Sequence, residues 1–206
     1  GNKGSLNIAQ YVSNVDTSIK QVLLDDALES WNTSSSALKK SMNELSLHIL
    51  DICQNSIKAD STLVEITINE DLKNNTYEIL IKDNGKGMDK RTLSEVSDPF
   101  FTTRTTRKVG LGISLFKMAA ELSDGSFKID STVDVGTVVH AVFGHNHINR
   151  APLGVIEDTI SILCLNETDI DITYTHNYND ACYVFSTAEV KEVLDGIPFT
   201  DYNVIM

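Results

Sequence analysis

The ten residues "IKDNGKGMDK" (81–90) follow a run in which apolar and polar residues alternate as they do in a β-strand. Two interpretations are open for this stretch. Asn84-Gly85 after alternating apolar residues is a strong signal for a plain hairpin turn. A carboxylate followed by two glycines at the end of a strand also suits a site where a ligand lies against the backbone. The neighbouring segments of the sequence distinguish a plain hairpin turn from a ligand site.

The composition limits the class of protein. The chain has 206 residues, of which 41% are hydrophobic, and this is enough for one domain with a core. A net charge of −12 argues against a general partner of nucleic acid or of an anionic membrane. There is no apolar run of membrane-spanning length and no signal-peptide pattern. The three cysteines are far apart and form no CxxC pair. We therefore expect a cytoplasmic protein.

The hydrophobic periodicity predicts an α+β fold, a two-layer sandwich with helices on one face of a mixed sheet. An N-terminal segment of unknown role (1–41) precedes the main domain (42–144), and an acidic C-terminal α/β extension (145–206) follows it. Helices are expected over 17–31, 42–59, 110–123, 154–166 and 187–197, and strands over 62–71, 76–84, 125–133, 136–143, 170–176 and 182–187. Residues 89–109 have no clear pattern.

Asp51 and Asn55 are four residues apart on the predicted helix 42–59, so their side chains project from one face. A carboxylate and an amide oxygen are ligands that suit Mg²⁺. A lone pair at this spacing is more often a solvated polar stripe. The pair becomes a metal-site hypothesis only if neighbouring segments also point to a ligand.

Of two further glycine-containing segments, the first points to a phosphate-bearing ligand. In "VGLGIS" (109–114), two glycines open a helix, whose N-terminal amides can bind an anion. The segment is neither a Walker loop nor a Rossmann fingerprint. "DVGTVV" (134–139) leads into a strand and by itself is only a turn. Residues 89–108 carry more basic than acidic side chains in an otherwise acidic chain, which is typical of a lid over a polyanion or of a solvated loop.

Taken in order, these segments resemble the GHKL superfamily of DNA gyrase, heat-shock chaperone ATPases, histidine kinases and MutL. "DICQN" resembles its N box, "DNGKGM" its first glycine box and "DPFFTTR" its F box, while "VGLGISL" and "GT" resemble the second and third glycine boxes. Five weak boxes in the family's order over residues 42–143 make a chance match improbable. Residues 81–90 are therefore interpreted as part of a ligand site rather than as a plain turn.

The resemblance implies a Bergerat-type ATP-binding fold that holds ATP or ADP with Mg²⁺. Asp83 would accept a hydrogen bond from the adenine amino group, Asn55 would hold Mg²⁺, and Asp51 would be the catalytic base. Residues expected to contact the nucleotide are Asn55, Asp83, Gly85, Gly87, Met88, Phe100, Thr102, Thr103, Arg104, Lys108, Gly110, Leu111, Gly112, Ile113 and Thr137. The implied activity is ATP hydrolysis or phosphoryl transfer to a protein.

Asp51 departs from the family pattern, because hydrolysing members usually have glutamate there. The shorter side chain keeps a second interpretation open, a nucleotide-switched binding module with little turnover.

No histidine precedes the helix 42–59, so autophosphorylation on a histidine within this chain is not expected. The chain also resembles small stand-alone proteins that accompany iron-only hydrogenase genes in anaerobic bacteria. A protein partner or phosphoacceptor is expected, and a homodimer is left open. "HNH" (145–147) is read as polar loop residues rather than a metal site.

Overall fold

The computed structural model describes residues 44–96, 112–165, 170–199 and 201. The predicted helix 17–31 and most of the predicted lid lie outside these residues. The described elements are α4 (Leu45–Lys58), β1 (Leu63–Asp71), β2 (Thr76–Asp83), α5 (Lys90–Val96), α6 (Gly112–Glu121), β3 (Ser126–Thr132), β4 (Gly136–Gly144), α7 (Ile156–Cys164), β5 (Asp171–Tyr178), β6 (Ala181–Ser186) and α8 (Thr187–Leu194).

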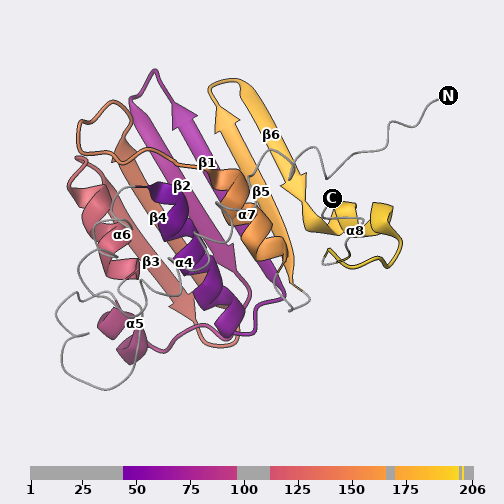
Figure 1. Ribbon diagram of the computed structural model, residues 1–206. Helices are drawn as coiled ribbons and strands as arrows, with labels where there is room; N and C mark the ends of the chain where they lie inside the picture. Colours follow the sequence, from indigo (N-terminus) through magenta and orange to yellow (C-terminus); the bar gives the residue numbers. More distant parts are fainter. Residues whose placement is uncertain (1–43, 97–111, 166–169, 200, 202–206) are drawn as a thin grey trace, which may run out of the picture.

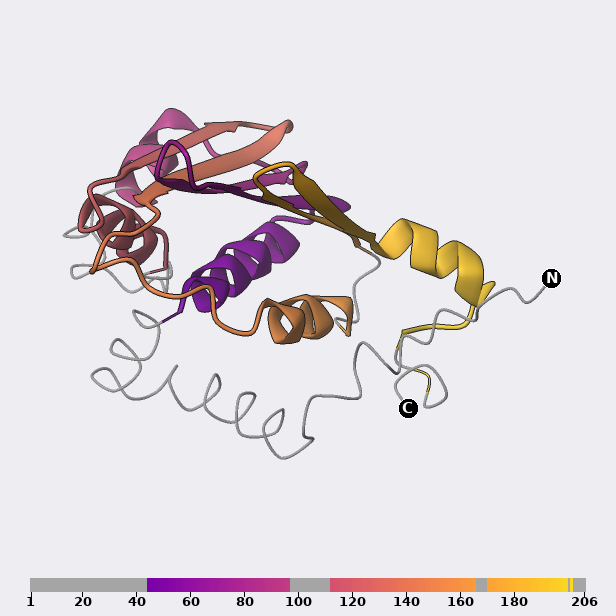
Figure 2. The same ribbon diagram turned by 90° about the horizontal axis from the view of Figure 1, so that it is seen from above.

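The strands form one six-stranded sheet in the order β3-β4-β2-β1-β5-β6. β1 and β5 are parallel, and every other neighbouring pair is antiparallel. Helices α4, α6 and α7 lie on the same face of this sheet (Figures 1 and 2). The predicted α+β sandwich with a mixed sheet is therefore confirmed. No helix in the described part of the chain has the length and apolarity that crossing a membrane requires.

The core lies between the sheet and these three helices. Strand residues alternate between the two faces of a sheet, and Ile66, Ile68, Ile79 and Ile81 are among those fully buried on the inner face. Burial of each such side chain contributes about 1.5–3 kcal/mol. The intervening residues are polar, as in the pairing of Glu65 with Lys82 at 3.2 Å. This alternation explains why the sequence predicted both strands of the β1–β2 hairpin.

The C-terminal extension is continuous with the sheet, because β5 pairs with β1.

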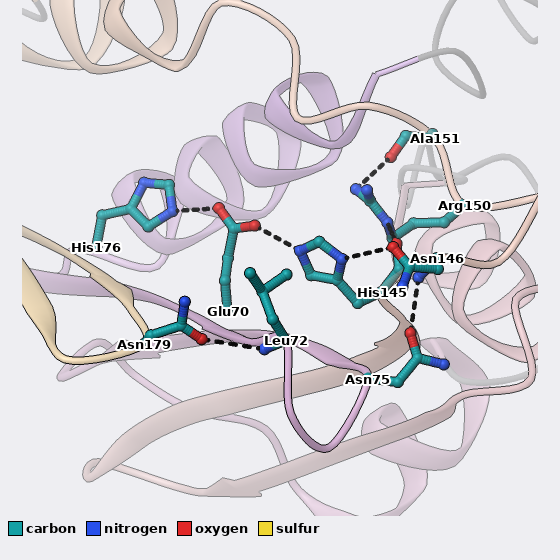
Figure 3. Close-up of polar contacts among 9 residues, drawn as sticks. All are labelled: Glu70, Leu72, Asn75, His145, Asn146, Arg150, Ala151, His176 and Asn179. Atoms are coloured by element: carbon teal, nitrogen blue, oxygen red, sulfur yellow. Dashed lines mark hydrogen bonds and ion pairs between the residues drawn. The ribbon is translucent and has the colours of Figure 1, made fainter.

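Glu70, near the end of β1, forms hydrogen bonds with two histidines (Figure 3). Its Oε1 lies 2.8 Å from Nε2 of His176 on β5, and its Oε2 lies 2.7 Å from Nε2 of His145 after β4. The hydroxyl of Tyr174 lies 2.9 Å from the other ring nitrogen of His176. This cluster ties three separate segments together, and His145 in it serves as a polar loop residue.

The structure differs from the sequence-based prediction over residues 89–109, where a short helix, α5, occupies Lys90–Val96. The Oδ1 atom of Asp89 accepts a hydrogen bond from the backbone N–H of Thr92 at 2.7 Å, as an N-cap residue does. The helix has only seven residues and one buried residue, Val96, so hydrophobic periodicity could not reveal it.

Candidate functional site

Asp83 is the last residue of β2, between Val64 on β1 and Thr137 on β4. Its Oδ1 accepts hydrogen bonds from the backbone N–H groups of Gly85 at 2.9 Å and Thr137 at 3.2 Å. Its Oδ2 accepts one from the Ser56 hydroxyl of α4 at 2.7 Å. Donors from a helix, a neighbouring strand and the following turn therefore fix the orientation of this carboxylate.

The turn after Asp83 is not a hairpin, because β2 leads into α5 rather than into a pairing strand. The side-chain oxygen of Asn84 accepts from the N–H groups of Thr62 and Leu63, both at 2.9 Å, and ties the turn to the start of β1. Gly87 has a φ of +62°, and a Cβ there would overlap the carbonyl oxygen of Thr132. The backbone thus passes so close to the β3–β4 turn that only glycine fits.

Two further predicted residues, Met88 and Thr137, meet through Ser131 on β3. The Ser131 hydroxyl accepts from the N–H of Met88 at 2.8 Å and lies 2.9 Å from the Thr137 hydroxyl. Gly85 packs closely against Ala59 at the end of α4. The structure therefore brings the predicted Gly85, Gly87, Met88 and Thr137 together around Asp83.

Sequence reasoning missed Ser56 and Ser131 as members of this site. Ser56 falls on the apolar face of the predicted helix and is buried. A buried hydroxyl needs a hydrogen-bond partner, so its place on that face was a usable signal. Ser131 gave no comparable signal, because one of its partners, the backbone N–H of Met88, comes from a distant turn that approaches it only in the folded chain.

Asp51, on α4, lies against the start of α6. A Cβ added to Gly112, the first residue of α6, would overlap the Asp51 carboxylate. Burial raises the pKa of Asp51, and the positive charge of Lys58 partly offsets this rise. An acid with a raised pKa is better suited to exchange a proton near neutral pH than an exposed carboxylate. The predicted base and the predicted phosphate-binding helix start are therefore in contact.

Asn55 is half-buried one helical turn after Asp51 and directly before Ser56. The amide oxygen of Asn55 is a hard donor, as Mg²⁺ prefers, and phosphate oxygens and water usually complete its coordination. The described residues contain no group of three or more histidine, cysteine or acidic side chains that would hold a metal by itself. The donor set thus fits a Mg²⁺ ion that arrives with a phosphate ligand.

Part of the predicted site lies outside the described residues. Ile113 is described, and its side chain is buried in the core, so its expected contribution is its backbone amide. The predicted residues that the structure does not describe are Phe100, Thr102, Thr103, Arg104, Lys108, Gly110 and Leu111.

Comparison with known proteins places this site in a family. Residues 42–146 match the family described as histidine kinase-, DNA gyrase B-, and HSP90-like ATPase. This match covers half of the chain, and the chain belongs to this family. The resemblance to the GHKL superfamily is thereby confirmed at the level of the superfamily.

Individual relatives match the same region. A protein of Shewanella frigidimarina, provisionally described as a sensor protein, is 37% identical over 97 residues, which are 46% of this chain and 15% of that protein. The sensor histidine kinase YvrG of Bacillus subtilis is 29% identical over 93 residues, which are 43% of this chain and 16% of that protein. The match therefore spans less than a fifth of the length of these two relatives.

Solved structures give looser similarities. The ATPase domain of Aquifex aeolicus MutL complexed with ADP has a TM-score of 0.43 and 16% identity, covering 71% of this chain and 67% of that one. The N-terminal domain of a DNA repair protein has a TM-score of 0.45 and 14% identity, covering 68% of this chain and 51% of that one. The family assignment rests on the sequence match rather than on these superpositions.

Proposed function

We propose that this chain binds Mg²⁺-ATP between α4, the end of β2 and the start of α6. The observation that carries this proposal is the fixed carboxylate of Asp83. An ionised carboxylate offers about four acceptor positions. Ser56, Gly85 and Thr137 occupy three of them, which leaves one for a donor such as the adenine amino group. Guanine carries a carbonyl oxygen at the equivalent place, so Asp83 favours adenine.

The phosphates would lie toward α6 in this arrangement. The N–H groups in the first turn of a helix bind anions, and α6 begins at Gly112, against Asp51. Asn55 would hold Mg²⁺, which would supply positive charge to offset the negative charge of the phosphates. Asp51 would accept the proton of the attacking water or of an acceptor hydroxyl. The proposed activity is therefore ATP hydrolysis or transfer of the γ-phosphoryl group to a protein.

A second candidate is a nucleotide-switched module that binds ATP or ADP with little turnover. Asp51 favours it, because an aspartate reaches one methylene less far than the glutamate found in hydrolysing relatives. In this case the acidic C-terminal extension would present a surface to a protein partner that depends on the nucleotide state.

One experiment separates these functions. The protein is incubated with γ-labelled ATP, with and without a lysate of its own cells. Label on a protein indicates a kinase and label released as phosphate indicates an ATPase, while label that stays on bound ATP indicates the switch. Absence of ATP binding contradicts all three.

Cytoplasmic location and the narrower resemblance to proteins that accompany iron-only hydrogenase genes stay predictions.

A further inference from the structure

A pocket with a volume of about 490 Å³ lies between α7 and the inner side of β5 and β6. It is separate from the proposed nucleotide site. Asp83 is paired with Val64 at the start of β1, whereas the pocket is lined by Glu70, near the other end of that strand. Sites for small molecules generally have volumes of about 300–1,000 Å³ and mainly apolar walls with a few polar groups. The volume of this pocket falls within that range.

Two strands and one helix form the walls of the pocket. On the strands, Tyr174 is paired with Phe185 and His176 with Tyr183. These four side chains line the pocket from the inner face of the sheet. α7 and its end supply the opposite wall through residues that lie on one helical face, namely Ile156, Glu157, Ile160, Ser161, Cys164 and Leu165. The walls are therefore mainly aliphatic and aromatic.

The acidic groups of the pocket lie toward one end. Glu70 is near the end of β1 and stands opposite Tyr178 of β5. Glu157 is in the first turn of α7, and in Figure 1 the start of α7 lies toward the end of the sheet where β5 turns into β6. Among the described residues that line the pocket there is no lysine or arginine, and Lys191 on α8 pairs with Asp171 at the other end of β5. The charges that face the pocket are therefore negative.

Glu70 retains acceptor positions that a ligand can use. An ionised carboxylate only accepts, so the Nε2 atoms of His145 and His176 donate to it at 2.7 and 2.8 Å (Figure 3). The hydroxyl of Tyr174, 2.9 Å from Nδ1 of His176, can donate to that nitrogen, which suits a neutral ring. A carboxylate has about four acceptor positions, so about two remain. The side chain of Glu70 is 16% exposed, and a ligand in the pocket can reach it.

We propose that this pocket binds a small organic cation, an amine attached to an aromatic or branched aliphatic body. The ammonium group donates to Glu70, and the charge of the exposed Glu157 attracts the same cation. The body packs between Ile160 and the rings of Tyr183 and Phe185. Tyrosine rings attract cations, whereas the two carboxylates repel an anion. An amine is therefore the class of ligand that suits both the walls and the charges.

Three naphthalene compounds with a common body and different charges test this proposal: 1-naphthylmethylamine, 1-naphthalenemethanol and 1-naphthoate. Each is titrated into the full chain at pH 8, with and without Mg²⁺-ATP, and binding is followed by ligand-observed NMR. We expect saturable binding of the amine under both conditions, about tenfold tighter than binding of the alcohol. Naphthoate should show no saturable binding.

Substitutions locate the bound amine. Glu70→Gln should weaken binding of the amine about tenfold and Glu157→Gln about two- to fivefold, without changing binding of the alcohol. Ser161→Trp fills the pocket and should abolish binding of both compounds. Val184→Trp is its matched control, because Val184 on β6 is 55% exposed and does not line the pocket. Far-UV circular dichroism checks folding, and Glu157→Gln, at an exposed position, decides the question if a more buried variant unfolds.

Four results would overturn the proposal. The amine shows no saturable binding, or the alcohol or naphthoate binds as tightly as the amine. Alternatively, Ser161→Trp binds the amine as Val184→Trp does, or Glu157→Gln leaves the preference for the amine over the alcohol unchanged. Displacement of the amine by ATP would also contradict the proposal, because it assigns the amine to the nucleotide site. ATP binding is measured in the same samples, so a failure of the proposed nucleotide site is seen separately.

Discussion

The hydroxyl oxygen of Ser56 lies 2.7 Å from Oδ2 of Asp83, and this hydrogen bond joins α4 to the end of β2. Ser56 directly follows Asn55, the residue expected to hold Mg²⁺. One short segment of helix therefore positions both ends of the proposed ligand, the adenine through Asp83 and the metal-bound phosphates through Asn55.

Ser56→Ala should weaken ATP binding without unfolding the protein. The hydrogen bond from Ser56 to Asp83 forms without ATP, so its loss lowers the free energy of unfolding by about 1.5–3 kcal/mol. It also lets the Asp83 carboxylate turn away from adenine, and we expect a rise of up to about tenfold in the Kd for ATP by calorimetry. Ser126→Ala, at an exposed position of β3, is the control and should leave the Kd unchanged. Equal Kd values for both variants would show that Ser56 does not orient Asp83.

Asp51→Asn should abolish turnover and keep ATP binding, because the amide cannot accept the proton but has nearly the same shape. If the short side chain of Asp51 limits proton transfer, the longer side chain in Asp51→Glu should raise kcat. Since burial raises the pKa of Asp51, the kcat of the wild type should fall on acidification at a higher pH than an exposed aspartate would cause. Steady-state phosphate release across pH tests these points. Unchanged kcat in Asp51→Asn would remove this residue from the mechanism.

His48 should make the fold sensitive to mild acid. It stacks on Phe116 with ring centroids 5.2 Å apart, and burial lowers its pKa from 6.5 to about 4. In the unfolded chain His48 takes up a proton below pH 6.5, while the folded protein resists this down to about pH 4. Stability is therefore lost as the pH falls through this window, by a total of about 3 kcal/mol.

Urea unfolding between pH 7 and pH 4 measures this loss. His48→Phe keeps the stacking and removes the titration, so its free energy of unfolding should depend less on pH. Ser126→Ala, at an exposed position of β3, removes no titratable group and is the control that should retain the wild-type slope. A slope unchanged in His48→Phe would contradict the assignment.

Glu70 should contribute pH-dependent stability at a lower pH than His48 does. Burial alone would raise its pKa, but hydrogen bonds from His145 and His176, with the charges of these histidines, outweigh burial and lower it. A folded pKa below the unfolded one gives stability that is present above the unfolded pKa, about 4.3, and is lost as the pH falls further. Glu70→Gln should therefore be less stable at pH 7 and less acid-sensitive below about pH 4.3. An unaltered acid transition in this variant would show that the cluster in Figure 3 contributes no pH-dependent stability.

Much of this arrangement could be predicted from local sequence. Alternation of apolar and polar residues predicted β1 and β2, and short apolar runs bounded by turn residues predicted β3 to β6. Helical periodicity predicted α4, α6 and α7, because each carries a continuous buried face. Asp83, Gly87 and Thr137 were predicted from the resemblance to the GHKL superfamily, and the structure places them near one another at the ends of strands and in the turn after β2. What local patterns could not supply was long-range pairing, such as the parallel alignment of β5 with β1. The contacts of Ser131 and the position of Gly112 against Asp51 also depend on how distant segments approach one another.

The most direct test of the central claim is a titration of ATP and GTP, each with Mg²⁺, into the wild type and Asp83→Asn. The variant keeps the shape of the side chain and removes its charge. We predict that the wild type binds ATP more tightly than GTP and that Asp83→Asn loses at least about tenfold in ATP affinity. Undiminished ATP affinity in a folded Asp83→Asn, or equal affinities of the wild type for ATP and GTP, would contradict the account.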